Sequence, residues 1–352
     1  MTLLNIFEMT YDELTHVFRE RYGKGHYHSS AVYRNVFKKG NACLSDLPEF
    51  QQSPHLAVGI AKKLHFPEAT ITNVVTEDGV IKFLTSYGDG LETESVIIPM
   101  KQYHTLCVST QVGCRQGCLF CKTGKMGFKR NLTAGEIISQ VYLARFILQK
   151  NIRNIVFMGM GEPLDNFKAV IQSINVLSDQ KGFDIAHRHI TVSTVGLYDG
   201  IRKLGEQGLK NLNLAISLNA PNDDIRSHLM PVNAIHSMSR IKEALLGYPL
   251  KRNGFFLIAY VLIKGVNDSK AHAFMLADYL NDIPVRLNIV PYNEIRENRF
   301  DRPSDADVHR FSSYLEQKNV FVRKRWRKGE RLHAGCGQLG NGFDPDDSLL
   351  QA

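Results

Sequence analysis

The sequence lacks several features that define other classes of protein. No apolar run reaches the roughly 18 residues that a membrane-spanning helix requires. The first residues, MTLLNIFEMTYDELTHVF, carry acidic side chains and no basic leader, which is not typical of a signal peptide. No internal repeat or low-complexity segment occurs. We therefore expect a cytoplasmic protein with no membrane partner.

Cysteine is also scarce. The 352 residues contain six cysteines, partly clustered and partly isolated, which does not resemble a disulfide scaffold. A reducing compartment agrees with this usage. Cys43, in KKGNACLSDLPEF, matches no motif, so we predict a structural role for it. With 43% hydrophobic residues the chain can bury a large core, and its length suggests one large domain with an appendage.

Basic residues outnumber acidic ones. Lys and Arg number 43 and Asp and Glu 35, for a net charge of +8. Such a balance favours a polyanionic partner through phosphate contacts. Many basic proteins bind no nucleic acid, so charge alone is a weak indication.

The most informative motif is CRQGCLFC, in which Cys114, Cys118 and Cys121 have CxxxCxxC spacing. Three thiolates in one loop can bind three corners of an iron–sulfur cube, and the fourth iron stays open for a small chelating ligand. The alternatives are a three-ligand zinc knuckle or chance spacing. A structural zinc site usually shows two CxxC pairs.

The flanking sequence predicts an α/β fold. Near-continuous apolar segments separated by helical stretches are typical of a parallel sheet covered on both faces. Counting the strand that enters the cysteine loop, six βα units are present. The other five strands are expected in RNIVFMGM (153–160), HITVST (189–194), LNLAISL (212–218), FFLIAYVLI (255–263) and VRLNIV (285–290).

The first hundred residues have a different pattern. Thr10 and Glu13 form a capping box for a helix that ends near Arg21. Further helices are expected from Ser29 or Ser30 to Gly40 and over 54–64. Between 69 and 98, β-branched runs flank the dipeptide Asp78-Gly79, which predicts an antiparallel hairpin.

Several motifs together carry a family resemblance. The stretch TLCVSTQVGCRQGCLFCKTGKMGFKRNLTAGEII resembles the RlmN/Cfr family of radical S-adenosylmethionine (SAM) RNA methyltransferases. The similarity covers roughly residues 90–340. It continues through MGMGEPLDN (158–166), SLNAPNDDIR (217–226), LMPVN (229–233), GVNDS (265–269) and GCGQL (335–339).

The resemblance implies a partial (β/α)6 radical SAM barrel with functional residues at the carboxyl ends of its strands. It also implies a [4Fe-4S] cluster on the three cysteines, two molecules of SAM per turnover, and an electron donor such as flavodoxin or ferredoxin. The matching positions for SAM contacts are Gly161, Glu162, Ser193, Ser217, Leu218, Asn219 and Asn293. Asn219 departs from the family, which usually has His there.

Two further cysteines gain a role from the resemblance. Adenine ring carbons are too weakly nucleophilic to take a methyl group directly from SAM, so a thiol carrier is needed. The family pattern makes Cys336 the methyl carrier and Cys107 the thiol that releases the product, leaving a Cys107–Cys336 disulfide. Glu94 matches a proton acceptor. The alternative for a lone cysteine is an inert buried thiol, although the flanking residues, such as the glycines around Cys336, argue against it; the alternative for Glu94 is a surface carboxylate.

A basic run, VRKRWRKGER (322–331), directly precedes Cys336. Its interleaved tryptophan favours phosphate contacts and base stacking over a solvated face. With Lys122, Lys125, Lys129 and Arg130 it is expected to form a positive wall.

We divide the chain into a helical accessory domain (1–66), an antiparallel β extension (67–100), a partial barrel (101–300), a basic segment with the carrier cysteine (301–341) and a tail (342–352). We expect a monomer that methylates C2 of an adenine in 23S ribosomal RNA, and transfer RNA as a further substrate. The alternatives are C8 methylation, a radical SAM enzyme acting on a small molecule or protein, and a non-catalytic RNA-binding protein with a zinc knuckle.

Overall fold

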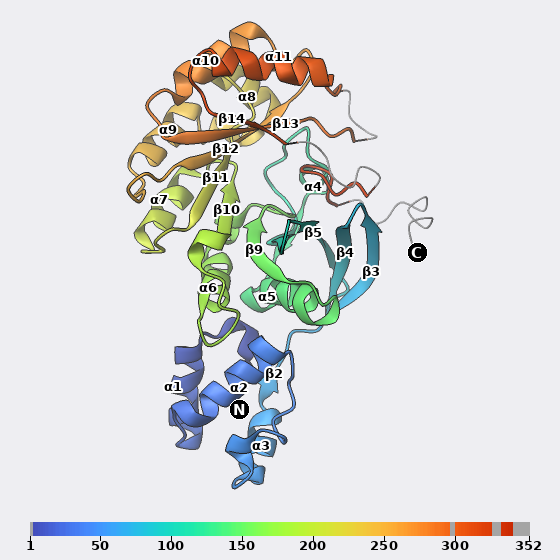
Figure 1. The fold of residues 1–352 in the computed structure, drawn as a ribbon, viewed down its shortest axis with the longest axis vertical. Coiled ribbons are helices and arrows are strands. Elements are labelled where there is room, and N and C mark those ends of the chain that lie inside the picture. Colours follow the sequence, from blue (N-terminus) through green and yellow to red (C-terminus); the bar gives the residue numbers. More distant parts are fainter. Residues whose placement is uncertain (1–2, 296–299, 326–331, 341–352) are drawn as a thin grey trace.

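The computed structural model describes residues 3–295, 300–325 and 332–340. It confirms an α/β fold organised around one ten-stranded sheet, in the order β14-β13-β12-β11-β10-β9-β6-β5-β4-β3 (Figure 1). The strands are β3 Ala69–Glu77, β4 Val80–Tyr87, β5 Glu92–Pro99, β6 His104–Cys107, β9 Ile152–Phe157, β10 Ile190–Thr194, β11 Asn213–Ser217, β12 Phe256–Leu262, β13 Val285–Pro291 and β14 Val322–Lys324.

The parallel part of the sheet begins at β6 and continues through β9 to β14, with each strand paired parallel to the next. Its first six strands are those expected for the partial barrel. The short β14 is an addition, because its residues belong to the segment expected to be only a basic run. Within the described residues β14 and β3 are the two ends of the sheet order, so the barrel is not closed.

Helices connect the parallel strands. They are α5 Ala134–Tyr142, α6 Phe167–Ser178, α7 Tyr198–Glu206, α8 Asp223–Leu229, α9 Met238–Leu246, α10 Lys270–Leu280 and α11 Asp305–Glu316. Leu106, Ile155 and Leu287 on one face of the sheet join the main hydrophobic core with helix residues. Alternate residues such as Cys107 and Asn288 line a cavity on the other face. On β13, polar residues such as Arg286 and Asn288 occupy this cavity face, so within the described residues the helices cover the opposite face.

The antiparallel part has the predicted hairpin. Asp78 and Gly79 have φ values of 49° and 76°, which suits the tight turn between β3 and β4. Strand β5 then pairs antiparallel with β6, with Val96 opposite Cys107. The extension is thus continuous with the parallel sheet.

The N-terminal helices are α1 Tyr11–Tyr22, α2 His26–Lys39 and α3 Pro54–Ala61. The Thr10–Glu13 capping box of α1 is confirmed. Helix α2 starts three residues before Ser29, at a Gly25 cap that makes no side-chain bond, and ends as predicted at Gly40. Phe37 of α2 contacts Phe183 of the main domain, with ring centroids 5.1 Å apart. Among the described residues, no helix is both long and apolar enough to cross a bilayer.

Candidate active site

The three motif cysteines lie on one loop between β7 Gln111–Gly113 and α4 Lys122–Lys125. Strand β7 pairs with β8 Phe128–Asn131, which closes the base of the loop. The backbone N–H of Cys114 donates to the carbonyl of Gly127 at 3.2 Å, and that of Leu119 donates to Leu229 at 2.9 Å. We call residues 114–121 the cluster loop. Its backbone is held from both sides.

The electrostatics of the cluster loop fit a bound cationic cluster. Burial raises the pKa of Cys114 to about 12. Burial also raises the pKa of Cys118 well above its usual range, and the charges of Cys121 and Cys114 raise it further. Three buried thiolates that repel one another need a positive partner to ionise together, and iron supplies one.

The described residues contain no preformed site for a single metal ion. Within the described residues, no three His, Cys, Asp or Glu side chains converge closely enough to hold one metal ion. In an iron–sulfur cube each cysteine binds a different iron, so the sulfur atoms stand further apart than around a mononuclear zinc.

Arg226 is a residue whose role the sequence did not reveal. It is fully buried, and its guanidinium donates to the side chain of Asn233 at 2.6 Å and to the carbonyl of His236 at 2.9 Å. Its positive charge opposes the rise in the pKa of Cys118. Its place within SLNAPNDDIR was visible, but only the fold places it near the cluster loop.

The glycine-rich loop after β9 packs tightly against the turn after β6. Gly161 has a φ of 98°, and a Cβ there would lie 2.5 Å from Cβ of Gln111. The glycine is therefore required by packing within the protein. Glu162 is buried, and its carboxylate accepts from the N–H groups of Leu164 at 3.0 Å and Val195 at 2.9 Å. Burial raises the pKa of Glu162 to about 7.

The other predicted SAM contacts lie at the same edge of the sheet. Ser193 is in β10, Ser217 ends β11, and Asn293 follows β13. Leu218 is buried, and its N–H donates to Ala259 at 3.0 Å. Asn219 has a φ of 60°, a conformation that Asn tolerates, and its side-chain oxygen accepts from the N–H of Val261 at 3.0 Å.

The structure brings Cys107 and Cys336 to one cavity of about 680 Å³, which Asn293 also lines. Burial raises the pKa of Cys107, and the nearby charge of Cys336 raises it further. Both are free thiols, so the expected Cys107–Cys336 disulfide is not supported. The expectation concerned the end of a reaction cycle, whereas this arrangement holds both thiols reduced.

The segment that carries Cys336, residues 332–340, is here called the carrier segment. Its backbone contacts the cluster-loop side of the site directly. Lys122 N–H donates to the carbonyl of Gly337 at 2.7 Å, and the hydroxyl of Thr123 donates to that of Leu339 at 2.6 Å. The side chain of Asn293 donates to the carbonyl of Cys336 at 3.1 Å. These bonds place the carrier segment against the start of α4.

Glu94 is not the surface carboxylate of the alternative interpretation, because only 1% of its side chain is exposed. Its carboxylate lies 3.6 Å from the ammonium of Lys82, which is fully buried. Glu94 and Lys82 share a face of the extension with Val96, a cavity-lining residue, because strand side chains alternate. No sequence pattern pointed to Lys82 as the partner.

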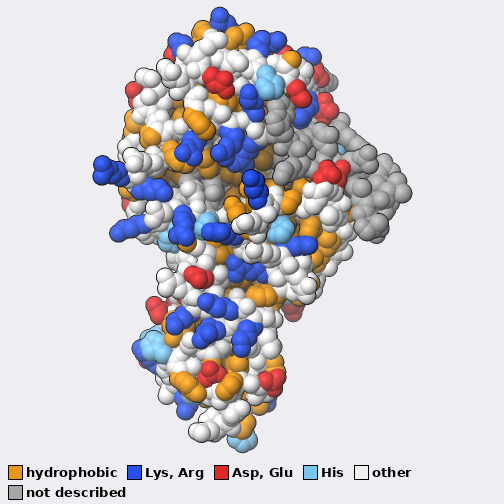
Figure 2. All heavy atoms as spheres, in the orientation of Figure 1, with side chains coloured by type: hydrophobic (Ala, Val, Ile, Leu, Met, Phe, Trp, Pro, Cys, Tyr) orange, Lys and Arg blue, Asp and Glu red, His pale blue; other side chains and the backbone are white. Residues whose placement is uncertain are grey.

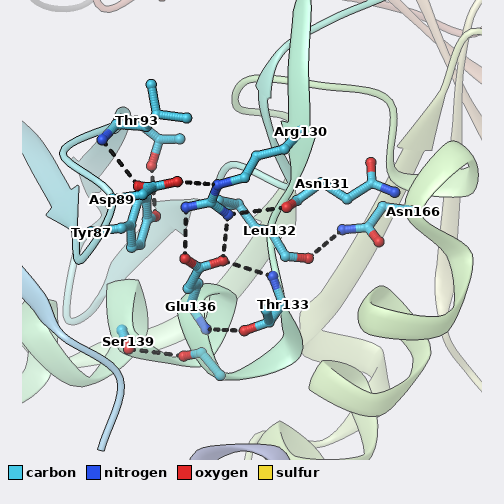
Figure 3. Close-up of polar contacts among 12 residues, drawn as sticks. Tyr87, Asp89, Thr93, Arg130, Asn131, Leu132, Thr133, Glu136, Ser139 and Asn166 are labelled. Atoms are coloured by element: carbon cyan, nitrogen blue, oxygen red, sulfur yellow. Dashed lines mark hydrogen bonds and ion pairs between the residues drawn. The ribbon is translucent and has the colours of Figure 1, made fainter.

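The expectation that Arg130 contributes to a positively charged surface beside the site is wrong. Arg130 is an anchoring residue: it pairs with Asp89 at 2.6 Å and with Glu136 at 2.8 Å, which ties β8 to the β4–β5 turn and to α5 (Figure 3). These two carboxylates neutralise its charge. Of the basic run, Arg323 and Arg325 line the cavity. Trp326, Arg327, Lys328 and Arg331 lie outside the described residues, as does the tail from residue 341.

Comparison with known proteins gives the family. The model of the radical SAM superfamily matches residues 108–277. A protein named "Probable dual-specificity RNA methyltransferase RlmN 1", from Protochlamydia amoebophila, is 40% identical over 339 residues, covering 96% of this chain and 94% of the relative. The chain belongs to the RlmN family. The dual-specificity RNA methyltransferase RlmN of Campylobacter jejuni is 38% identical, covering 88% of this chain and 90% of its own.

A solved structure has the same fold over nearly the whole chain. A radical SAM methyltransferase from Sphaerobacter thermophilus has a TM-score of 0.88 and 34% identity, covering 96% of this chain and 99% of its own. The family implies a [4Fe-4S] cluster and SAM. The residues that would hold the cluster are Cys114, Cys118 and Cys121, whose burial and mutual repulsion fit that group.

Proposed function

We propose that this chain transfers a methyl group from SAM to C2 of an adenine in 23S ribosomal RNA, and to transfer RNA as well. The observation that carries the proposal is the meeting of Cys107 and Cys336 in one cavity, with the carrier segment hydrogen-bonded to the start of α4. Two thiols at one site supply both a methyl carrier and a group that releases the product.

We assign each residue a step. Cys336 attacks the methyl group of one SAM, so that a sulfur–carbon bond forms on the protein and S-adenosylhomocysteine leaves. The cluster, when bound, supplies the electron that splits a second SAM. Glu94 takes the proton from the ring carbon, and the ammonium of Lys82 lies 3.6 Å from its carboxylate. Cys107 attacks the sulfur of Cys336, so that the bond from this sulfur to the transferred carbon breaks, methyladenosine leaves, and a Cys107–Cys336 disulfide forms that a reductant returns to two thiols.

The strand-end residues would position SAM. Gly161, Glu162, Ser193, Ser217, Leu218, Asn219 and Asn293 come from neighbouring strands and converge on the edge of the sheet where the cluster loop lies. Glu162 already accepts two backbone N–H groups, but a carboxylate has further lone pairs that can accept from the ammonium group of SAM. Asn293, which also holds the carbonyl of Cys336, would link bound SAM to the carrier segment.

The test is anaerobic incubation of the reconstituted protein with SAM, a chemical reductant and protein-free 23S ribosomal RNA, followed by mass spectrometry of the nucleosides. We expect 2-methyladenosine, with two SAM consumed for each methyl group transferred. The appearance of 8-methyladenosine would instead establish the C8 alternative. The absence of any methylated adenosine, with active cluster and intact RNA, would overturn the proposal.

The Cys336→Ala variant tests the carrier role. We expect it to abolish RNA methylation while 5′-deoxyadenosine formation stays measurable, because no thiol remains to accept the first methyl group. Cys43→Ala is the matched control, since Cys43 is an exposed thiol whose sulfur lies within hydrogen-bond distance of the side chains of Ser45 and Asp46. If Cys336→Ala still methylated RNA, Cys336 would not be the methyl carrier.

A further inference from the structure

The cavity extends along the inner face of the sheet to the edge opposite Cys107. Five residues at that edge form what we call the mouth: Arg188, Phe255, Arg286, Phe321 and Arg323. Each lies just before a parallel strand or within its first two residues. Parallel strands all start at the same edge of a sheet, so the mouth residues gather there although they are distant in sequence.

Cys107 and Asn293 mark the other end, because they lie at the carboxyl ends of β6 and β13. Tyr103 and Cys107 both line the cavity and lie four residue steps apart along the chain, roughly 13 Å if it is extended. The mouth and the thiols are therefore two separate parts of one cavity.

Among the described residues that line this cavity, the charged groups are basic. They are the arginines of the mouth and Arg325, with the side chain of His189 beside them, and no described lining residue is Asp or Glu. Within the described part of the chain, these arginines form no ion pair with a carboxylate. On the face shown in Figure 2, Lys and Arg side chains collect across the middle of the molecule, where Asp and Glu are sparse. Such a surface attracts an anionic ligand.

Aromatic rings hold one of these arginines in place. The guanidinium of Arg286 lies 3.7 Å from the ring centroid of Phe255 and 5.5 Å from that of Phe321. Stacking occupies the faces of the guanidinium and leaves its N–H edge available for two acceptor oxygens. Phe321 is 54% exposed, so its ring remains accessible to a ligand.

We propose that the mouth binds phosphates and a base of the unpaired RNA chain next to the target adenine, while that adenine reaches Cys107 and Cys336 through the cavity. This inference rests on the proposed function. Arg286 and Arg323 contact phosphate oxygens, and Phe321 stacks on a base. Arg325, nearer the carrier segment, adds a further positive charge between the mouth and the thiols.

The chemistry favours an unpaired chain. A free phosphate would occupy only the mouth and would not use the remaining length of the cavity. In a duplex the adenine ring stays inside the stack, and enzymes that modify a base take it out of that stack. Arginine planes and aromatic rings are the groups on which unpaired RNA bases stack.

The experiment measures binding of an oligoribonucleotide with the target adenine, under anaerobic conditions and at several salt concentrations, to the wild-type protein and to the Arg286→Gln/Arg323→Gln double variant. Removal of one phosphate contact lowers the slope of log K against log salt by roughly 0.7, so we expect a fall of about 1.4 for the double variant. We also expect an increase of about tenfold or more in KM for RNA. Thermal unfolding of each variant checks that it is folded.

The matched control is Arg202→Gln on the outer helix α7, an exposed arginine with a similar contact, 5.7 Å from the ring centroid of Tyr198. For this variant, the slope of log K for RNA binding against log salt should equal that of the wild-type protein. A Phe321→Leu variant should weaken binding at every salt concentration without changing the slope, because it removes stacking and keeps the charge.

Two results would overturn the inference. One is an unchanged slope and KM in a folded double variant whose wild-type parent methylates the RNA. The other is equal binding of the same sequence in single-stranded and duplex form. Failure of the wild-type protein to methylate RNA would instead count against the proposed function, so the two failures can be told apart.

Discussion

The cluster loop and the carrier segment meet in space but are held in different ways. Cys114 and Cys118 of the cluster loop are buried, and the β7–β8 hairpin closes the loop at its base. Cys336 is exposed, and its segment is attached mainly through hydrogen bonds to neighbouring loops. Leu332 and Leu339 at the two ends of the segment are buried with Val80 and Val96 of the extension.

The difference agrees with the two kinds of chemistry that we propose for these segments. A redox cluster is tuned by burial and by fixed hydrogen bonds, so its ligands belong in a rigid, solvent-excluded loop. A thiol that accepts a methyl group and then reaches a nucleotide must be accessible to both. Apolar anchors at the ends and an exposed thiol in the middle provide that accessibility.

The strongest effect should come from breaking the base of the cluster loop with Gly113→Ala. Gly113 has a φ of 74°, and a Cβ would lie 1.8 Å from the carbonyl oxygen of Gly127. Because both the backbone conformation and the space exclude a side chain, we expect a loss of at least about 2 kcal/mol in stability. The temperature of thermal unfolding and the iron content after anaerobic reconstitution should both fall.

Gly59→Ala is the control for that variant. Gly59 lies in helix α3, and a Cβ added there would have no neighbouring atom within 4 Å, so alanine should be neutral or stabilise the helix by up to about 1 kcal/mol. Normal iron content in Gly113→Ala would show that the hairpin does not fix the cluster ligands.

An intermediate effect is expected from loosening the carrier segment with Gln338→Leu. The side chain of Gln338 accepts from Gly335 N–H at 3.2 Å and donates to the carbonyl of Glu294 at 3.2 Å. Leucine leaves these groups unpaired, which costs about 1.4 kcal/mol. The equilibrium constant for docking of the carrier segment then falls about tenfold. RNA methylation should fall by that factor, while reductive SAM cleavage falls far less. Gln317→Leu, at an exposed helix end, is the control. If Gln338→Leu lost RNA methylation and reductive SAM cleavage equally, its role would not be confined to the carrier segment.

The weakest effect is expected at the surface of the cluster loop. Arg115 pairs with Asp165 at 2.9 Å and lies 4.0 Å from the ring of Phe128, but its side chain is 52% exposed. Arg115→Gln should therefore change stability by less than about 1 kcal/mol, and less still at high salt. Urea unfolding at two salt concentrations measures this. A loss of several kcal/mol would mean that surface charge, rather than burial, holds the loop.

Local patterns predicted much of the fold because they act over a few residues. The Thr10–Glu13 capping box and the Asp78-Gly79 turn formed as expected. Contacts between distant segments were not predictable in this way. Arg130 was predicted to belong to a positively charged surface. Its partners Asp89 and Glu136 lie in other elements, so the local sequence did not show that they neutralise it. The need for glycine at position 161 was likewise not visible in its own segment, because Gln111 lies where a side chain at 161 would stand.

Consecutive residues were enough to specify the cysteine spacing, the alternation of strands and helices, and the family. The folded chain was needed to show that Cys107 and Cys336 share a cavity, that Lys82 pairs with Glu94, and that arginines near the starts of three different strands meet at one mouth. A parallel sheet aligns the ends of strands that lie far apart in the chain, so the resulting burial and charge belong to the sheet edge rather than to any one segment.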